Sequence, residues 1–455
     1  MKRLLAFCVF SIASLAPAQQ QTGPTALPSS PFSVRKTWQI GGEGAWDYLA
    51  VDPTAQQLFI AHGQSVQVVD IETGSLTGQI VARDSVAGLD STGRRRGLGE
   101  AHGIALDDSG QYGYISAGIT GIVEVFDRRL LKVVASVPTG PSPRAIVFEP
   151  RTRLVFVICA APTEPPSQGS RPQTPAILPK SWITVIETEK WKRVGNIQVA
   201  GKLGFAQADG KGNIFVNVVD ANEILSFDAQ AVETLLLDPP KDEPPAEAPP
   251  NPTTAQKATA STRPPSAAAT TSEKEEAAET INRPSLEWPG SNRQSRSSNG
   301  TPVYFPLSGG CQQPTGLAID STHERLFVAC GNLKLAVLNS ASGALVASLD
   351  IGLGSDVVGY DPNRGLIYAA NGGGLGSLSI IRQDVTDTYE VVQDLPTQPR
   401  TRTLAVNPVS GDVYLVAAMS GFDLSRKGKV MVPGTLPVVQ ETPVSGSFQV
   451  LVVGR

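Results

Sequence analysis

A pattern of about 40 residues recurs along the chain, and this repeat restricts the fold more than any other feature of the sequence. In its clearest copy, residues 315–320 (TGLAID) are followed by a turn and then by residues 325–329 (RLFVA). Two further β-type runs, 334–338 and 344–349, follow after the turns Gly331-Asn332 and 340–343. Four short β runs separated by turn residues are typical of one blade of a β-propeller.

The opening of this copy, which ends in an acid or Asn before a turn, occurs seven times. The other six openings span residues 48–53, 103–107, 145–150, 205–209, 357–362 and 403–408. Their terminal Asp, Glu or Asn can accept hydrogen bonds from backbone N–H groups two residues further on, which fixes the turn. We therefore predict an all-β fold, a seven-bladed β-propeller. A miscounted short strand would leave six or eight blades as alternatives.

The two ends of the repeat region predict how the ring closes. Residues 447–453 supply only a third strand for the seventh blade, whereas residues 32–41 resemble the outer strand of a blade such as 345–352. Pairing the N-terminal strand into the last blade covers a sheet edge and closes the ring. We expect that closure, with residues 32–455 forming one domain.

The first 18 residues have the pattern of a secretory signal peptide. Lys2 and Arg3 precede an apolar run, residues 4–15, and Ala16-Pro17-Ala18 forms an A-x-A cleavage site. The run is too short to span a bilayer, and no later stretch is long enough. We expect a cleaved signal peptide (1–18), which removes Cys8, and a periplasmic or secreted protein. An uncleaved membrane anchor is the alternative.

Three segments interrupt the rhythm of the blades: 84–99, which contains Arg94-Arg95-Arg96, 160–180 and 238–300. The longest is rich in Pro, Ala and Thr, and such a composition cannot bury enough apolar surface to offset chain entropy. We predict a disordered insertion at 238–300 in the fourth blade, entered after the strand-like Leu235-Leu236-Leu237 and left near residues 286–289. The triple Arg is interpreted as a solvated loop, with an anion contact as the alternative.

Composition excludes several classes of function. The formal net charge is −4, and −6 without Lys2 and Arg3, so duplex nucleic acid is not an expected partner. Only three histidines are present, which is little material for a histidine-rich metal site. We predict no cofactor and no metal, no transmembrane segment, and a monomer.

Several runs resemble a known family, the bacterial YncE-like propellers with YVTN repeats. They are Trp46-Asp47-Tyr48, 101–105 (AHGIA), 208–212 (ADGKG), 314–318 (PTGLA) and the closing segment 448–454. The WD dipeptide of WD40 repeats is absent from the blade ends. The resemblance implies an exported propeller of a family whose members mostly lack an assigned reaction.

The sequence contains no G-x-S-x-G, H-E-x-x-H, P-loop or C-x-x-C motif, so we predict no catalytic residues. The glycine-rich run 372–376 is interpreted as a hairpin turn, because no helix follows it. Loops before each first strand and between second and third strands share the face around the channel mouth, where polar groups from several blades converge. The candidate binding residues in these loops are Trp46, Asp47, His62, Glu100, His102, Arg144, Asn332, Asp356, Asn371 and Arg402.

Two functions remain open at this stage. The first is a non-catalytic binding or scaffold protein whose channel face or long loops contact an unknown protein or small molecule. The second is a hydrolase similar to lactonase-type propellers, in which Glu100, His102 and Arg144 would polarise and attack an ester carbonyl with water. Arg144 and Arg402 could also bind an anion, or pair with Asp356 or Asp47.

The cysteines give one more prediction. Cys311 precedes the first strand of the fifth blade and Cys330 ends its second strand, so antiparallel pairing brings them to the same end of the blade. In an oxidising compartment we predict a disulfide between them, with two buried thiols as the alternative. Cys159 is then expected to be a free buried thiol.

Overall fold

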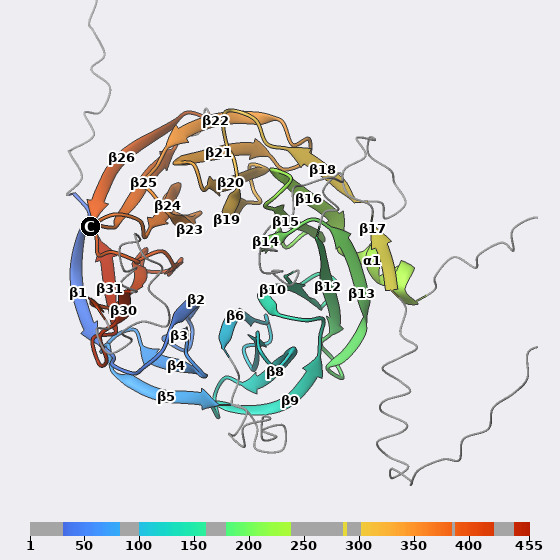
Figure 1. Cartoon of the computed structure of the whole chain (residues 1–455), viewed down its shortest axis with the longest axis horizontal. Coiled ribbons are helices and arrows are strands. Elements are labelled where there is room, and N and C mark those ends of the chain that lie inside the picture. The colour runs from blue at the N-terminus through green and yellow to red at the C-terminus, as the bar shows by residue number, and fades with distance from the viewer. Residues whose placement is uncertain are drawn as a thin grey trace, which may run out of the picture.

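In the part of the chain that the structure describes, seven small, mainly antiparallel sheets stand in a ring around a central axis (Figure 1). The computed structural model describes residues 31–81, 100–160, 179–237, 285–288, 302–384, 387–422 and 441–455. Each sheet is one blade, and its first strand lies innermost. The prediction of a seven-bladed β-propeller is confirmed.

Successive blades follow one another along the chain. The first contains β2 (Trp46–Asp52), β3 (Gln57–His62), β4 (Ser65–Asp70) and β5 (Leu76–Val81), and the second β6 (Ala101–Leu106), β7 (Tyr112–Ala117), β8 (Ile122–Asp127) and β9 (Lys132–Pro138). The third contains β10 (Pro143–Glu149), β11 (Leu154–Cys159), β12 (Lys180–Glu187) and β13 (Lys192–Ala200), and the fourth β14 (Leu203–Ala208), β15 (Asn213–Val218), β16 (Glu223–Asp228) and β18 (Val303–Pro306). The fifth contains β19 (Pro314–Asp320), β20 (Arg325–Cys330), β21 (Lys334–Asn339) and β22 (Leu345–Asp350), and the sixth β23 (Ser355–Asp361), β24 (Leu366–Asn371), β25 (Ser377–Gln383) and β26 (Tyr389–Pro396).

The seventh blade is built from both ends of the repeat region. Its sheet runs β27 (Leu404–Val406), β28 (Val413–Ala417), β31 (Gln449–Gly454) and β1 (Ser33–Gln39), and a small hairpin of β29 (Ser420–Phe422) and β30 (Glu441–Pro443) lies between β28 and β31 in the chain. β1 pairs antiparallel with β31, from Ser33 opposite Gly454 to Gln39 opposite Gln449. The predicted closure by the N-terminal strand is therefore confirmed.

The acid or Asn that ends each repeat opening holds the turn after the innermost strand, as predicted. Asp52 accepts a hydrogen bond from the Thr54 N–H at 3.1 Å, and Glu149 accepts one from the Thr152 N–H at 2.7 Å. The same arrangement occurs at Asp107, Asp209, Asp320, Asp361 and Asn407. One side chain per blade thus satisfies backbone donors that the turn would leave unpaired.

Hydrophobic side chains pack mainly between neighbouring blades, because both faces of a blade are covered. Phe59 of the first blade contacts Phe126 of the second, with ring centroids 5.5 Å apart, and both are fully buried. Trp38 of β1 stacks on Tyr414 at 5.7 Å and reaches across to the first blade. There a Cβ on Gly74, whose φ is +75°, would lie 2.3 Å from the Trp38 ring, so only glycine fits.

The segment 229–237 differs from the sequence-based expectation. Leu235-Leu236-Leu237 is not strand-like but ends the helix α1 (Ala229–Leu237). Asp228 caps the helix by accepting a hydrogen bond from the Ala231 N–H at 2.7 Å. The apolar residues Ala229, Val232 and Leu236 recur at helical spacing and are buried, so the period of the pattern is helical and the leucine run alone was misleading.

Part of the predicted insertion is ordered structure. Residues 285–288 form β17 (Ser285–Trp288), which adds parallel to β13 as a fifth strand of the third blade and covers its outer edge. Trp288 is buried against Phe227, with ring centroids 5.0 Å apart. The rest of 238–300 lies outside the described residues, as do residues 1–18, for which a signal peptide is predicted, and Arg94-Arg95-Arg96.

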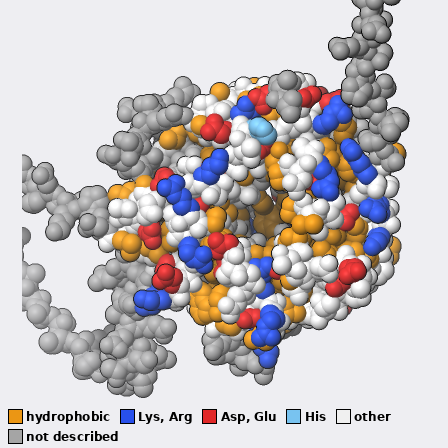
Figure 2. Space-filling model, turned by 180° about the vertical axis from the view of Figure 1, so that it is seen from behind, with side chains coloured by type: hydrophobic (Ala, Val, Ile, Leu, Met, Phe, Trp, Pro, Cys, Tyr) orange, Lys and Arg blue, Asp and Glu red, His pale blue; other side chains and the backbone are white. Residues whose placement is uncertain are grey.

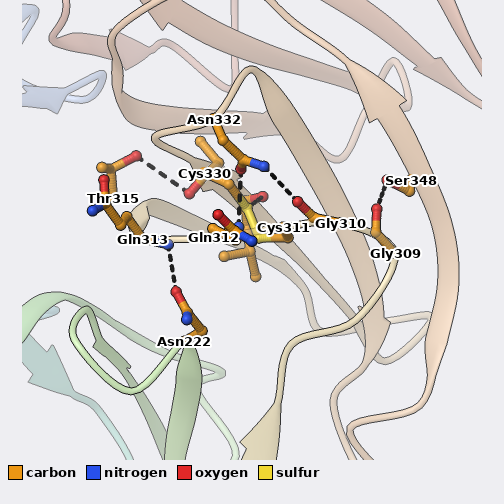
Figure 3. The surroundings of a disulfide bond; sticks show 12 residues. Asn222, Gly309, Gly310, Cys311, Gln312, Gln313, Thr315, Cys330, Asn332 and Ser348 are labelled. Carbon is orange, nitrogen blue, oxygen red and sulfur yellow. Dashed lines mark hydrogen bonds between the residues drawn. A yellow bond between two sulfur atoms is a disulfide. The ribbon is translucent and has the colours of Figure 1, made fainter.

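Cys311 and Cys330 form a disulfide, with their Cα atoms 5.5 Å apart (Figure 3). Pro314 pairs with Cys330 in the ladder between β19 and β20, so the bond ties the segment before β19 to the end of β20. Cys159 is free and buried, and burial raises the pKa of its thiol to about 11. No described helix is long and apolar enough to span a membrane.

Candidate functional site at the channel mouth

The innermost strand of each blade begins on one face of the ring, which we call the mouth face. The turns between the second and third strands lie on the same face. The ladder shows this directly, because Trp46 at the start of β2 pairs with His62 at the end of β3, and Ser355 pairs with Asn371. Just after this first pair the register shifts in each of the first six blades. Such irregularities re-aim side chains and are common beside binding sites.

In these six blades the second residue of the innermost strand falls at this irregularity, and in the seventh blade the corresponding residue is Arg402. In blade order these residues are Asp47, His102, Arg144, Gly204, Thr315, Asp356 and Arg402, the last standing two residues before β27. Charged or titratable side chains therefore occupy five adjacent blades, the sixth through the third, whereas the fourth and fifth blades carry Gly and Thr. The charged and titratable side chains at these positions are therefore unevenly distributed around the mouth face.

Asp47 and His102 join the first two blades. Asp47 Oδ2 lies 2.6 Å from His102 Nδ1, and both side chains are largely buried. Glu100 lies on the rim, with Oε2 3.8 Å from His102 Nε2. A Cβ built on Gly118 would lie 2.5 Å from His102 Nε2, so this nitrogen packs against the backbone of the neighbouring turn.

Asp356 and Arg402 join the sixth and seventh blades, with Arg402 Nε 3.3 Å from Asp356 Oδ2. This is one of the pairings that the sequence left open. Burial raises the pKa of Asp356, although Arg402 and Arg144 act in the opposite direction. The same two arginines and the carboxylates of Asp47 and Asp356 also act on Tyr48, whose pKa is raised well above its usual value, chiefly by burial.

Two hollows open on the mouth face beside this cluster. The first, which we call the arginine hollow, has a volume of about 250 Å³ and is lined by Ala45, Trp46, Gly354, Gly372, Gly373, Arg400 and Arg402. The second, of about 280 Å³, lies between the first and seventh blades and is lined by residues that include Glu43, Trp46, His62, Val444 and Phe448. Trp46 lines both hollows.

The remaining predicted residues have structural contacts. Asn371 is fully buried and its Nδ2 donates to Ser379 Oγ at 2.9 Å, so it holds the blade together. Asn332 braces the loop at the disulfide, because its Oδ1 accepts from the Gln312 N–H at 2.9 Å (Figure 3). His62 Nδ1 lies 2.8 Å from Gln67 Oε1, and burial lowers its pKa.

Sequence reasoning missed Arg400 and Tyr48. Arg400 lies over the Trp46 ring, with Cζ 5.8 Å from the ring centroid. Tyr48 follows Asp47 directly, and aligning all seven openings would have shown an aromatic residue at its position in only the first and fourth blades. For Arg400 the signal was its place two residues before Arg402, in the loop that leads into the seventh blade.

Exposed apolar side chains also gather in the loops of the mouth face. Among the described loops between strands, large exposed hydrophobic residues on this face are Ile119, Leu333, Leu353, Leu375, Met419 and Val444. The turns of the opposite face contribute Leu130 and Val409. Figure 2 shows the opposite face of the ring, where hydrophobic side chains line a central hollow and charges of both signs surround it. Among the described residues, no group of three His, Cys, Asp or Glu side chains could hold a metal ion.

No protein-family model matches the chain, and no curated protein matches it either. Solved structures of similar shape include "RRP9 WD40 repeats" (8% identity, TM-score 0.54, 83% of this chain and 88% of that one). A second is "U3-55K" (8% identity, TM-score 0.55, 91% of this chain and 97% of that one). A third is a chain of the "Mitotic Checkpoint Complex" (13% identity, TM-score 0.52, 91% of this chain and 95% of that one). At such identities the likeness shows the propeller fold alone.

Proposed function

We propose that this protein is an exported, non-catalytic binding scaffold of the YVTN-repeat kind, which contacts a protein partner through its mouth face. The observation that carries the proposal is the concentration of exposed apolar side chains in the mouth loops of the fifth, sixth and seventh blades. These loops adjoin the two hollows and the charged cluster. Apolar side chains next to convergent polar groups are what a protein interface needs.

Matched surface variants test the proposal. The double variant Leu353→Ser/Leu375→Ser changes the mouth face, and Leu130→Ser/Val409→Ser changes the opposite face by the same chemistry. In quantitative cross-linking and capture from the native compartment, we expect the first to lose the proteins that the wild type retains and the second to keep them. Equal capture by both variants would overturn the proposal.

Export is supported by the signal-peptide pattern of residues 1–18 and by the Cys311–Cys330 disulfide, since such bonds persist in oxidising compartments. Cell fractionation with N-terminal sequencing tests it. We expect a mature chain that starts at Gln19 and is found outside the cytoplasm. An intact N-terminus in the cytoplasmic fraction contradicts export.

A hydrolase is the second candidate, because Asp47 and His102 form the carboxylate–imidazole pair of a general base. Against it, His102 Nε2 packs on Gly118 and the imidazole is largely buried, so a substrate has poor access to the base. A panel of lactones, tested with and without divalent metal, separates the candidates. Turnover that is lost in His102→Gln would favour the hydrolase.

A further inference from the structure

Three exposed leucines stand on adjacent mouth loops of the fifth and sixth blades, and we call them the leucine strip: Leu333, Leu353 and Leu375. They are 43%, 54% and 86% exposed. The Ile351 N–H donates to Leu333 O at 3.1 Å, and the Gly373 N–H donates to Leu353 O at 2.8 Å. Leu375 follows two residues after Gly373 in the same turn. Backbone hydrogen bonds therefore join the three loops that present the leucines to solvent.

Leu333 has a backbone conformation that does not suit leucine. It stands directly before the third strand of its blade, with φ +67°. In the second, fourth and sixth blades the residue at this place also has a positive φ, and it is Gly121, Asn222 and Gly376, respectively. Glycine and asparagine adopt this conformation readily, whereas a bulky side chain is strained there. A strained and exposed leucine contributes little to the fold, which indicates a role in binding.

The arginine hollow adjoins the leucine strip, because Gly354 and Gly373 form part of its wall. Its volume is about 250 Å³. A cavity of about 150 Å³ can hold a benzene molecule. Pockets that enclose whole small molecules begin at about 300 Å³. The hollow therefore has the size for one ring-bearing side chain.

Both arginines of the hollow already have partners, so charge alone does not select an anion there. Arg400 Cζ lies 5.8 Å from the centroid of the Trp46 ring. Arg402 Nε lies 3.3 Å from Asp356 Oδ2, and the Arg402 side chain is 51% exposed. This ion pair uses the edge of the Arg402 guanidinium, and a guanidinium that is paired along its edge can still stack on an aromatic ring through its flat face. The walls thus favour a neutral ring.

We propose that the leucine strip and the arginine hollow bind a segment of a protein partner that carries an aromatic residue between apolar residues. The ring enters the hollow and stacks on Arg402, and the flanking apolar side chains lie on the leucine strip. An aromatic side chain that fills a pocket is a common centre of a protein interface. This inference rests on the proposed function, because it names what the mouth face recognises.

Titration of the whole chain with capped peptides, followed by NMR signals of the peptide, tests the aromatic preference. The probe is Ac-Ser-Leu-Phe-Leu-Ser-NH₂, and the matched probe has cyclohexylalanine, a saturated ring of similar size, in place of Phe. We expect the Phe peptide to bind about two- to fivefold more tightly, which is the strength of such stacking at an exposed site. Arg402→Lys keeps the charge opposite Asp356 but lacks the flat face, so it should remove the difference. Equal binding of both peptides to the wild type would overturn the inference.

Two further variants test the place of binding. Ala45→Phe fills the hollow from an exposed position of its wall and should weaken binding of the Phe peptide about tenfold or more. Leu333→Asn should weaken it about threefold or more, because an apolar contact is lost. The same substitution should keep or raise the midpoint of thermal unfolding, because asparagine suits the positive φ. Leu130→Ser/Val409→Ser, on the opposite face, is the control.

Unchanged binding in Ala45→Phe that unfolds at the wild-type temperature would overturn the hollow as the site. A lower unfolding midpoint with unchanged binding in Leu333→Asn would show that Leu333 serves the fold, against the inference. N-acetylphenylalaninamide that binds as tightly as the pentapeptide would assign the hollow to a free aromatic molecule and overturn the partner segment.

Capture experiments separate this inference from the proposed function. If Ala45→Phe still captures the partner that Leu353→Ser/Leu375→Ser loses, the aromatic site fails while the binding scaffold stands. If the Phe peptide binds as expected but no partner depends on the mouth face, the binding scaffold fails while the aromatic site stands.

Discussion

Tyr48 of the first blade and Phe205 of the fourth meet edge to face across the central channel, with ring centroids 5.2 Å apart. Each is the third residue of its innermost strand, one place beyond the position occupied by Asp47 and Gly204. The channel is therefore bridged by an aromatic pair directly below the charged cluster. A ligand at the mouth meets this floor rather than an open pore.

The buried tyrosines predict a loss of stability at high pH. Burial raises the pKa of Tyr48 well above its usual value and that of Tyr304 and Tyr389 to about 12. In the unfolded chain tyrosine ionises near pH 10, so stability is full below that pH and falls as pH rises toward the folded values. Each tyrosine that ionises only in the unfolded chain lowers the free energy of unfolding by about 1.4 kcal/mol per pH unit in this range.

Urea unfolding at pH 9, 10 and 11 measures this slope. A Cys159→Ala background avoids thiolate attack on the disulfide. Tyr48→Phe should lower the slope, because it removes one of the shifted groups. A free energy of unfolding that stays constant up to pH 11 would show that the phenols ionise equally in both states.

The disulfide should stabilise the fifth blade. Cys311 and Cys330 are 19 residues apart, and closing a loop of that length contributes at most about 3 kcal/mol in the chain-entropy account. The double variant Cys311→Ala/Cys330→Ala should lose up to that amount in urea unfolding, with Cys159→Ala as control. Mass spectrometry of an unreduced digest should recover the two cysteines as one cross-linked peptide. Separate alkylation of both would refute the bond in the exported protein.

Trp38 should be the strongest single contact of the closing strand. Trp38→Ala leaves a cavity beside Tyr414 and Gly74, and we expect a loss of about 3–5 kcal/mol. Lys36→Ala, at an exposed position of the same strand, should change little. Deleting residues 32–40 should cause aggregation, because it uncovers the edge of β31. A soluble and equally stable truncation would contradict the closure.

The segment 241–282 should be dispensable for folding. Its composition contains few apolar residues, and the deletion spares both α1 and β17. We expect the midpoint of thermal unfolding to stay within a few degrees of the parent. Trp288→Ala, by contrast, removes the contact with Phe227 and should lower it clearly. A collapse of cooperative unfolding after the deletion would mean that the segment packs against the ring.

The repeat made most of the fold predictable, because a blade is a local unit whose turn residues stand at fixed places. The acids at Asp52 and Asp361, for example, hold the same turn in two different blades. What failed was the segment after Asp228, where leucines typical of a strand belong to a capped helix. β17 was also missed, because it pairs with residues of β13 that lie 89 positions earlier in the chain, such as Asn196 opposite Ser285, and no local pattern encodes that pairing.

The candidate site was predictable only as a face. The position of Asp356 or Arg402 in a repeat says that its side chain lies at the mouth, but not which neighbour it contacts. The pairs Asp47–His102 and Asp356–Arg402 depend on side-chain directions, and Asp47, His102 and Asp356 each stand at the shifted register after the first ladder pair. Asn332 and Asn371 occupy equivalent loops and serve the loop itself, which spacing alone does not distinguish.

The pairing of Ser33 with Gly454 is a contact between segments more than four hundred residues apart in the chain. A contact of such high order forms late, since most of the polypeptide must be arranged before the two strands meet. The same ladder is then the last to form and the place where the ring opens. The lifetime of the folded state should therefore depend more on the pairing of β1 with β31 than on the pairing within any other blade. Substitutions in this ladder should change the unfolding rate more than the folding rate.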